Sequence, residues 1–227
     1  MSQPLRIGIA GLGTVGVGVV KILRNKAELL KQRTGRELVI SAVSARDTRK
    51  DRGVAVSDYV WERDPVALAQ RDDVDIFVEL MGGHDGPALE ATKTALAAGK
   101  DVVTANKAML AHYGHELAIM AEENVALIRF EAAVAGGIPV IKSLTEGLAG
   151  NQISRVMGVM NGTCNYILTQ MQATGRGYDA LFEECAELGY LEADPMLDVG
   201  GIDAGHKLSL LSAIAFGTRV DFDSIAL

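Results

Sequence analysis

The feature that most constrains this chain is a glycine-rich hexapeptide near its amino terminus. Residues 11–16 read Gly-Leu-Gly-Thr-Val-Gly, after an apolar run at 5–10 that predicts a strand and before a helical pattern. In this setting Gly11 permits a tight turn, Gly13 lets a pyrophosphate approach the backbone and Gly16 lets the helix pack on the strand. The N–H groups at the helix start attract the phosphates. We therefore predict a dinucleotide site rather than a plain glycine turn, formed by Gly11, Gly13, Thr14, Val15 and Gly16.

Residues 1–130 alternate short apolar runs with longer helical patterns, which is typical of a parallel sheet wrapped by crossover helices. The predicted strands are 5–10, 38–44, 75–80, 101–104 and 125–130. The predicted helices are 14–32, with Gly35 as its cap, 65–70, 87–98 and 107–123, and the rest of the charged segment 46–73 is expected to be a loop. The fold class is therefore α/β, a Rossmann-type doubly wound parallel sheet.

After Glu131 this alternation stops. A glycine-rich turn at 135–139 leads into a predicted helix at 140–149, a strand at 153–160 and helices at 163–173 and 178–188. We place a domain boundary near residue 130, so that 1–130 form the dinucleotide-binding domain and 131–227 form a partial α+β domain. The sequence stops inside what reads as the start of another element, and we expect it to belong to a longer protein.

Charge and cysteine content restrict the partners and the compartment. The chain carries 29 acidic and 22 basic side chains, a net charge of −7, whereas nucleic-acid binding needs a basic excess. Two cysteines are too few for a disulfide framework and suit free thiols in the cytoplasm. We predict neither a secretory leader nor a membrane span, because the apolar stretches are interrupted well before the roughly 18 residues that a bilayer crossing needs.

The end of the second predicted strand discriminates between dinucleotides in such sheets. A carboxylate there binds the ribose 2′-hydroxyl, whereas an arginine accepts a 2′-phosphate. Here Arg46 is followed by Asp47, and three more cations follow at Arg49, Lys50 and Arg52. The cluster favours NADP slightly, while Asp47 keeps NAD open. A solvated charged loop explains the same residues equally well.

Two lysines occupy positions that suggest a function. Lys107 begins a helix after a predicted strand, at the edge where open α/β sheets bind ligands, and its charge opposes the helix dipole. Lys207 follows Asp203 by one turn, on a stripe shared with aliphatic side chains, in a helix whose composition predicts burial nearly all round. A partly desolvated acid–base pair suits general acid–base catalysis. The alternatives are a surface lysine and an ordinary i,i+4 salt bridge.

Three further positions are weaker candidates. Glu192, in the loop before that helix, could bind a substrate ammonium or be solvated. Cys164, at the start of a predicted helix, could have a lowered pKa and act as a nucleophile, although a buried, inert thiol is commoner. Glu131, with the carbonyls of the turn at 135–137, could coordinate a hard cation.

Six segments together resemble homoserine dehydrogenases. They are, in chain order, Gly11-Leu-Gly-Thr-Val-Gly16, Thr104-Ala-Asn-Lys107, Phe130-Glu-Ala-Ala-Val-Ala-Gly-Gly-Ile-Pro139, Asn161-Gly-Thr-Cys-Asn-Tyr-Ile167, Glu192-Ala-Asp-Pro195 and Asp198-Val-Gly-Gly-Ile-Asp-Ala-Gly-His-Lys-Leu208. They extend over nearly the whole chain, and the last is highly specific to that family. The resemblance implies reversible reduction of L-aspartate 4-semialdehyde to L-homoserine with NAD(P)H, in the biosynthesis of threonine, methionine and isoleucine.

The resemblance also implies roles for individual residues. Lys207 would donate a proton to the aldehyde oxygen, and Asp203 would orient the substrate. Glu192 would bind the substrate amino group, and Lys107 would lie between substrate and cofactor. Gly189 would contact the dinucleotide together with the glycine loop. A monovalent cation, usually sodium, would be held by Glu131 and by the carbonyls of Val134, Gly136 and Ile138.

Members of this family continue past the equivalent of residue 227, with the rest of a catalytic and dimerisation region. The resemblance therefore implies a homodimer or higher homo-oligomer of a longer protein, and it counts against Cys164 as a nucleophile. Two alternatives stay open. One is a module that only binds a dinucleotide, and the other is a thiol-dependent semialdehyde dehydrogenase that uses Cys164.

Overall fold

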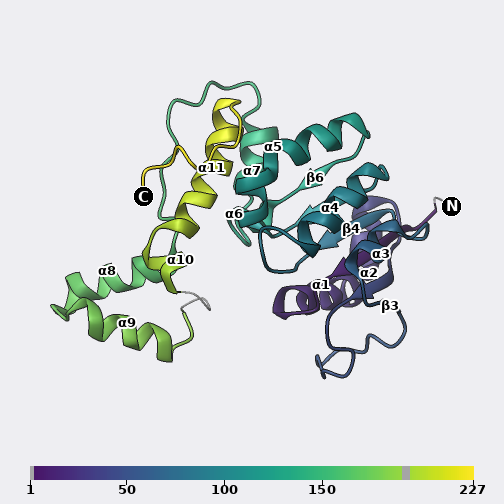
Figure 1. Ribbon diagram of the computed structural model, residues 1–227, viewed down its shortest axis with the longest axis horizontal. Helices are drawn as coiled ribbons and strands as arrows, with labels where there is room; N and C mark the ends of the chain where they lie inside the picture. Colours follow the sequence, from purple (N-terminus) through teal and green to yellow (C-terminus); the bar gives the residue numbers. More distant parts are fainter. Residues whose placement is uncertain (1–2, 191–194) are drawn as a thin grey trace. The chain divides into compact units, whose positions relative to one another are not determined.

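The computed structural model describes residues 3–190 and 195–227, and the chain divides into two compact units, Met1–Pro139 and Val140–Leu227 (Figure 1). The first unit is built on a six-stranded parallel sheet in the order β3-β2-β1-β4-β5-β6. Its strands are β1 (Leu5–Ala10), β2 (Leu38–Ser44), β3 (Val60–Glu62), β4 (Ile76–Glu79), β5 (Asp101–Thr104) and β6 (Ile128–Arg129). The chain builds outwards from β1 to one edge and then crosses to build the other half. This is the doubly wound Rossmann topology, so the predicted fold class is confirmed.

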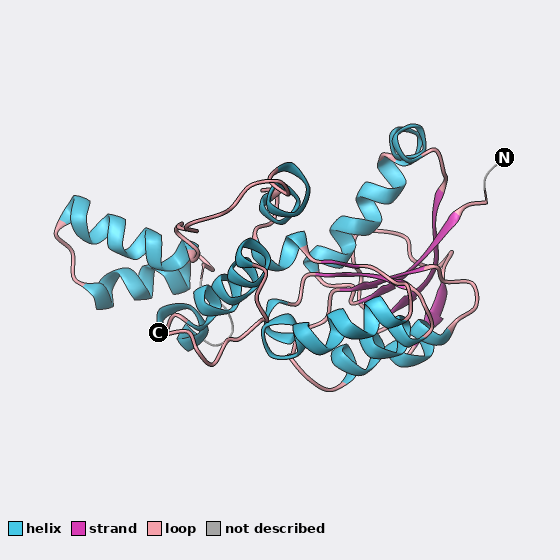
Figure 2. Ribbon diagram, turned by 90° about the horizontal axis from the view of Figure 1, so that it is seen from above, coloured by secondary structure: helices cyan, strands magenta, loops and turns pink. Residues whose placement is uncertain are grey.

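Helices lie on both sides of this sheet (Figure 2). They are α1 (Thr14–Asn25), α2 (Ala27–Thr34), α3 (Pro65–Gln70), α4 (Pro87–Ala97), α5 (Lys107–Glu123) and α6 (Glu131–Val134). The helix predicted at 14–32 is interrupted at Lys26, whose φ of −119° and ψ of 18° leave the helical region. α2 ends at Gly35 as predicted, because glycine adopts the left-handed φ of 70° found there without a steric cost.

Two strand predictions differ from the structure. The strand predicted at 125–130 is confined to Ile128–Arg129, because Val125 adopts a positive φ of 55° in the turn that leaves α5. β3 was not predicted, since it is only three residues long and lies within the charged segment 46–73. Both strands are at the edges of the sheet, where one neighbour rather than two stabilises a strand.

One hydrophobic cluster of the first unit forms between the central strands and α1. It contains the buried residues Ile7, Ile9, Leu12, Val20, Ile40, Val43 and Val78. Several of them lie on β1, β2 and β4, and Val20 lies on α1 and is fully buried. This packing fixes the start of α1 against the carboxyl end of β1, where the glycine loop lies.

The second unit is helical in its described residues. Its elements are α7 (Val140–Lys142), the π-helical turn η1 (Ser143–Gly147), α8 (Gly162–Thr174), α9 (Tyr178–Glu187), α10 (Pro195–Val199) and α11 (Ile202–Phe216). α8 and α9 form a hairpin around Ile167, Leu181 and Cys185, and α10 packs on both α8 and α11. In the described parts of both units, no helix combines the length and the apolar character that a bilayer crossing requires.

The strand predicted at 153–160 is wrong. Residues 152–161 have neither helical nor strand structure, and the side chains of Met157 and Val159 are 78% and 75% exposed. A strand needs a neighbouring strand to take up its backbone hydrogen bonds. The described part of the second unit contains none, so an apolar, β-branched segment remains irregular.

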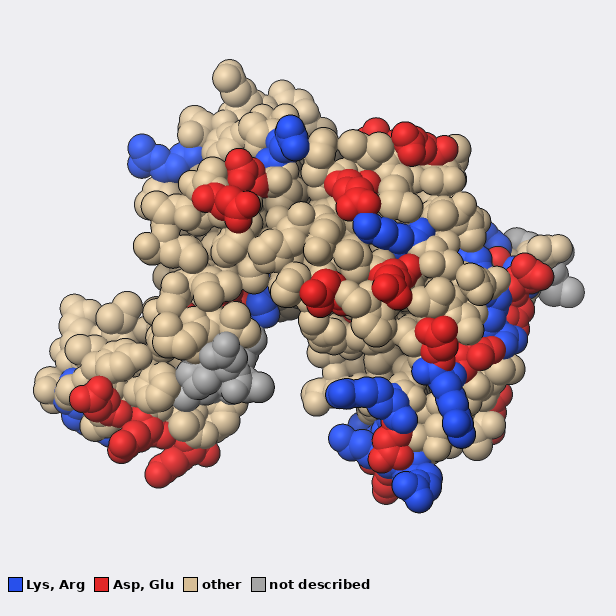
Figure 3. Space-filling view, viewed as in Figure 1, with Lys and Arg blue, Asp and Glu red and all other residues tan. Residues whose placement is uncertain are grey.

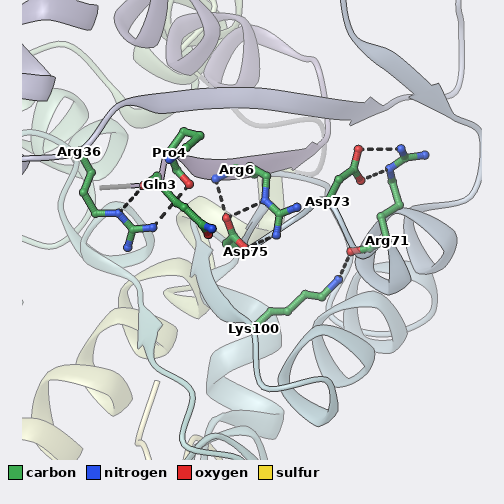
Figure 4. A network of polar contacts seen from close by, with 8 residues as sticks. All are labelled: Gln3, Pro4, Arg6, Arg36, Arg71, Asp73, Asp75 and Lys100. Carbon is green, nitrogen blue, oxygen red and sulfur yellow. Dashed lines mark hydrogen bonds and ion pairs between the residues drawn. The ribbon is translucent and has the colours of Figure 1, made fainter. Parts of the chain in front are cut away.

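A polar network ties the strands together at the end of the sheet opposite the glycine loop (Figure 4). Arg6 in β1 donates to the carboxylate of Asp75 from its guanidinium at 2.6 and 3.0 Å and from its backbone N–H at 2.8 Å. Arg71 donates in a similar way to Asp73, and Lys100 donates to the Arg71 carbonyl. These bonds connect the starts of β1, β4 and β5.

Asp75→Asn is expected to reduce the amount by which the free energy of unfolding falls as the pH is lowered below about 4. The hydrogen bond from Arg6 lowers the pKa of Asp75 below its value of about 3.9 in an unfolded chain. The pair therefore stabilises the fold above about pH 4, and this contribution is lost as the pH falls through the lower folded-state pKa. Urea unfolding at a series of pH values, followed through the single tryptophan, Trp61, measures the change. Asp72→Asn, at an exposed neighbour, is the control; identical profiles for both variants would contradict the prediction.

Candidate active site

The glycine loop between β1 and α1 is closely packed at two of its three glycines. Gly11 has a φ of +100°, and a Cβ atom there would lie 2.3 Å from the Leu80 carbonyl oxygen. A Cβ atom on Gly16 would lie 1.9 Å from the Gly11 carbonyl oxygen. Only glycine therefore allows α1 to start directly on the turn and the turn to lie against the end of β4.

The third glycine is open to solvent. No atom lies within 4 Å of the position that a Cβ on Gly13 would take, and Gly13 is the residue that precedes α1. Thr14 and Val15 begin the helix beside it and are also exposed. The backbone is thus accessible at the place where the fingerprint puts a pyrophosphate, and the residues present fit a dinucleotide.

Arg52 connects the loop after β2 to the glycine loop. Its guanidinium donates to the carbonyl oxygens of Leu12 at 3.2 Å and Lys50 at 2.8 Å, and it lies 5.3 Å from the centre of the Trp61 ring. An arginine in this position has several of its donors committed to the protein backbone. Of the four cations predicted near a 2′-phosphate, Arg52 is therefore the one that organises the loop.

The other charged residues of this loop face solvent. Arg46, Asp47, Arg49 and Lys50 are exposed, and Figure 3 shows basic and acidic side chains gathered over the loop between β2 and β3. The carboxylate of Asp47 accepts the backbone N–H of Arg49 at 2.8 Å, which closes a turn of the loop. The acid that could have bound a ribose diol is thus engaged in local structure, while Arg46 stands beside the end of β2.

A buried carboxylate that was not predicted lies at the end of β4. Glu79 is fully buried and accepts hydrogen bonds from Thr104 Oγ1 at 2.5 Å and from the Met81 N–H at 2.6 Å. Burial raises the pKa of Glu79, while these hydrogen bonds act in the opposite direction. An acid that ends an otherwise apolar strand, as in Ile76–Glu79, is the pattern that could have identified it.

Lys107 is the first residue of α5, as predicted. Asn106 caps the helix with its side-chain oxygen and donates from Nδ2 to the Gly83 carbonyl at 2.6 Å. Thr104 Oγ1, which binds Glu79, also accepts the Asn106 N–H at 3.0 Å. The buried acid and its partners therefore hold the turn that carries Lys107, at the carboxyl edge of β4 and β5.

In the second unit α11 brings Asp203 and Lys207 together, as predicted. Lys207 Nζ lies 2.7 Å from Asp203 Oδ2 and also donates to the Met160 carbonyl oxygen at 2.8 Å. The side chain of Asp203 is 4% exposed and that of Lys207 is 20% exposed. The buried residues of α11 are Asp203, Gly205, His206, Ser209, Leu210 and Leu211, whereas the others are partly or fully exposed, so burial of this helix is less complete than predicted. The Lys207 side chain is thus partly accessible to solvent, although the Asp203 carboxylate that it contacts is buried.

Two further polar residues, neither of them predicted, belong to this cluster. Asn161 precedes α8, and its Nδ2 donates to Asp198 Oδ1 at 2.8 Å and to Asp203 Oδ2 at 3.2 Å. Asp198 is 4% exposed. The contacts join residues 37 and 42 positions apart, so no local spacing could have indicated them. Among the described residues, the cluster thus brings together two buried carboxylates, one amide and one lysine.

Cys164 lies in the first turn of α8, but its surroundings oppose a thiolate. Burial raises its pKa, and so do the nearby carboxylates of Asp198 and Asp203. The Sγ atom lies 3.4 Å from the Asp198 carbonyl oxygen, to which a thiol can donate. The lowered pKa considered for Cys164 is therefore wrong, and with it the main argument for a thiol mechanism.

Cys164 is expected to react more slowly with iodoacetamide in the folded protein near pH 8 than the same residue does in urea. The raised pKa leaves less thiolate than an unfolded cysteine has. Mass spectrometry of the tryptic peptide at successive times gives the rate. Faster alkylation in the folded state would contradict the prediction, and Cys164→Ser is expected to leave any turnover of the full-length protein intact.

Gly189 lies on the wall of a cavity of about 680 Å³ in the second unit. The cavity is also lined by Tyr190 and by residues of α8, among them Thr163, Asn165 and Tyr166. These lining residues are neutral, and Gly189 has a φ of +72°. Glu192, the predicted ligand of a substrate ammonium, lies outside the described residues.

The predicted cation ligands lie in and after α6. Glu131 begins the helix and Val134 ends it, and Gly136 and Ile138 follow in a turn where Gly137 has a φ of +82°. One carboxylate and three backbone carbonyls are hard oxygen donors, so the donor set fits a sodium-like ion. Among the residues that the structure describes, no group of three or more His, Cys, Asp or Glu side chains is arranged to hold a metal ion.

Comparison with known families gives two adjoining matches. Residues 11–131 match the NAD binding domain of homoserine dehydrogenase, and residues 139–227 match the family's homoserine dehydrogenase domain. The homoserine dehydrogenase of Neisseria gonorrhoeae is 47% identical over 222 residues, which are 98% of this chain and 51% of that protein. The Pseudomonas aeruginosa enzyme is 43% identical over 97% of this chain and 50% of its own length.

Solved structures agree. A homoserine dehydrogenase from Thiobacillus denitrificans has a TM-score of 0.92 and 44% identity, covering 98% of this chain and 51% of that one. A hyperthermophilic archaeal homoserine dehydrogenase in complex with NADPH has a TM-score of 0.83 and 32% identity, covering 99% of this chain and 75% of that one. The chain spans about half the length of the curated relatives it matches. Its fold, its glycine loop and these matches agree, and the chain belongs to the homoserine dehydrogenase family.

Proposed function

We propose that the full-length protein is an NAD(P)-dependent oxidoreductase that interconverts L-aspartate 4-semialdehyde and L-homoserine, and that this chain supplies its dinucleotide site and part of its substrate site. The observation that carries the proposal is the ion pair between the buried Asp203 and the partly exposed Lys207, in a chain of this family whose glycine loop is open at Gly13. The alternative of a thiol-dependent dehydrogenase has no such support, because the pKa of Cys164 is raised.

Lys207 is the group proposed to move the proton. Reduction of an aldehyde adds a hydride to carbon and a proton to oxygen, and a bound reduced nicotinamide supplies the hydride. The Lys207 ammonium, held by Asp203 Oδ2 and partly exposed, donates the proton to the oxygen and receives it back in the reverse direction. Asp203 orients both the lysine and the substrate.

Negative charge around the pair is proposed to select the amino acid substrate. Asp198 and Asp203 are both buried, and the Asn161 amide bridges them. Glu192 is proposed to bind the substrate ammonium, and the two buried carboxylates are proposed to add to the attraction. Lys107, at the edge of the sheet, is proposed to contact substrate and cofactor.

The proposed cofactor is NADP, with NAD as the alternative. Arg46 is exposed beside the end of β2, and the carboxylate of Asp47 is engaged with the Arg49 N–H. A cation is therefore better placed than an acid for the group on the ribose 2′-position. Gly11, Gly13, Thr14, Val15 and Gly16 are proposed to bind the pyrophosphate, and Gly189 to contact the dinucleotide.

Arg46→Ala is expected to weaken the binding of NADPH about tenfold and that of NADH much less. A charge-assisted hydrogen bond to a phosphate accounts for an effect of this size, and NADH lacks the 2′-phosphate. Fluorescence titration of both nucleotides measures it in the full-length protein. Arg33→Ala, an exposed arginine on α2, is the matched control. An equal loss of affinity for NADPH and for NADH would contradict the prediction.

Further properties are proposed from the same family. A monovalent cation, sodium in the first instance, is proposed to bind Glu131 and the carbonyls of Val134, Gly136 and Ile138, where the donor set fits it. The full-length protein is proposed to be a homodimer or higher homo-oligomer, without nucleic acid or membrane as partner. It is proposed to be cytoplasmic, a compartment that suits the free thiols of Cys164 and Cys185.

The direct test is an assay of the full-length protein with L-homoserine and NADP or NAD. The expected result is an increase in the absorbance of the reduced nicotinamide that depends on homoserine. Absence of turnover with either cofactor would overturn the proposal. Calorimetry on the same sample would then show whether the protein is a module that only binds a dinucleotide.

A further inference from the structure

We infer that Asn161 is a positioning residue for the Asp203–Lys207 pair. Met160 and Asn161 hold both members of the pair. The Met160 carbonyl accepts a hydrogen bond from the Lys207 ammonium, and the Asn161 amide donates one to the Asp203 carboxylate. The inference rests on the proposed function, because it assigns Asn161 a role through the group that moves the proton. Asn161 itself is not placed in contact with the reacting atoms.

The orientation of the Asn161 amide is determined by its three partners. Its Oδ1 accepts the Cys164 N–H at 2.8 Å and so caps α8. Its Nδ2 donates to Asp198 Oδ1 at 2.8 Å and Asp203 Oδ2 at 3.2 Å. A flipped amide would place an oxygen against two carboxylates and an N–H₂ group against a backbone N–H. Only one orientation satisfies all three contacts.

The same turn holds the lysine. A lysine ammonium carries three hydrogens, and in Lys207 two of them are directed at the Met160 carbonyl at 2.8 Å and at Asp203 Oδ2 at 2.7 Å. The carbonyl and the amide belong to consecutive residues, so they move together with the start of α8. Because two bonds fix the ammonium, the direction of its third hydrogen is fixed as well.

The Asn161 amide also separates like charges. Asp198 and Asp203 are each almost completely buried, and Nδ2 bridges one oxygen of each. Loss of the bridge would remove one donor from each carboxylate and would weaken the restraint that keeps Asp203 Oδ2 against the Lys207 ammonium. The bridge therefore positions the carboxylate to which the ammonium donates.

Asn161→Ser separates this role from the capping of α8. Serine is as good a helix cap as asparagine, so the unfolding temperature should change little, but it has no amide N–H₂ to bridge the carboxylates. We expect kcat to fall about ten- to a hundredfold, with the KM for NADPH unchanged. Asn161→Asp, which also caps but adds a third carboxylate, should lower kcat further. Asn151→Ser, at an exposed position of the same unit, is the control.

A double-mutant cycle in the full-length protein tests whether Asn161 acts through Lys207. If it does, Asn161→Ser should lower kcat less than about twofold when Lys207→Ala is already present. Equal fold-losses in both backgrounds would mean a general structural effect and would overturn the inference. Unfolding temperatures of all variants establish that each one folds.

Crystal structures of the full-length wild-type and Asn161→Ser proteins provide a readout that needs no activity. The expected result is a Lys207 side chain that has left Asp203 Oδ2 or the Met160 carbonyl in the variant. A lysine in its original place would overturn the inference. If the wild-type protein shows no turnover of homoserine, the proposed function fails, and the structures alone decide the role of Asn161.

Discussion

Lys207→Arg in the full-length protein is expected to lower kcat by about 10²- to 10⁴-fold, the range that general acid–base catalysis contributes. Arginine keeps a positive charge beside Asp203 and can donate to the same carbonyl, so the fold should be retained. It cannot deliver a proton at neutral pH, because the pKa of a guanidinium lies far above neutrality. Steady-state assays with homoserine and each nicotinamide cofactor measure kcat and the KM of both ligands.

The control for this prediction is Lys142→Ala. Lys142 is in the same unit, its side chain is 68% exposed, and its ion pair with Glu146 is 3.5 Å long. Such surface pairs contribute little to stability, so both turnover and unfolding temperature should match the wild type. A Lys207→Arg enzyme with wild-type kcat would show that another group donates the proton, whereas an increase confined to KM would assign Lys207 to substrate binding.

Features set by local spacing could be predicted from the sequence. The glycine loop depends on three positions within one hexapeptide, and the Asp203–Lys207 contact on one helical turn, so neither requires knowledge of distant residues. The long strands at the centre of the sheet were predicted for the same reason. Buried parallel strands form uninterrupted apolar runs that glycine and charge delimit.

Features that depend on distant partners could not be predicted. Asn161 meets Asp198 and Asp203 only after α8, α10 and α11 have packed, and Glu79 meets Thr104 only across two strands. For the segment 153–160 the error is the opposite one, because a strand was predicted and none is present. Its composition favours a strand, but a strand forms only if another strand is beside it, and no local pattern contains that information.

Gly13→Ala is expected to leave the fold intact and to weaken dinucleotide binding by on the order of ten- to a hundredfold. A methyl group on Gly13 meets no protein atom within 4 Å, so it fills only the space through which a pyrophosphate would approach the backbone. Isothermal titration with NADPH and NADH measures affinity, and thermal unfolding measures stability. Unchanged affinity would mean that the phosphates bind elsewhere.

Gly16→Ala, unlike Gly13→Ala, is expected to lower the stability of the first unit. A Cβ atom 1.9 Å from the Gly11 carbonyl oxygen forces α1 away from the turn, a strain of at least about 1–3 kcal/mol. Gly18→Ala, two residues further along α1, is the matched control, because no atom lies within 4 Å of a Cβ there. Alanine has the higher helix propensity, so this variant should gain about 0.5–1 kcal/mol. Destabilisation by Gly16→Ala but not by Gly13→Ala would distinguish the glycine required for packing from the one kept open for a ligand.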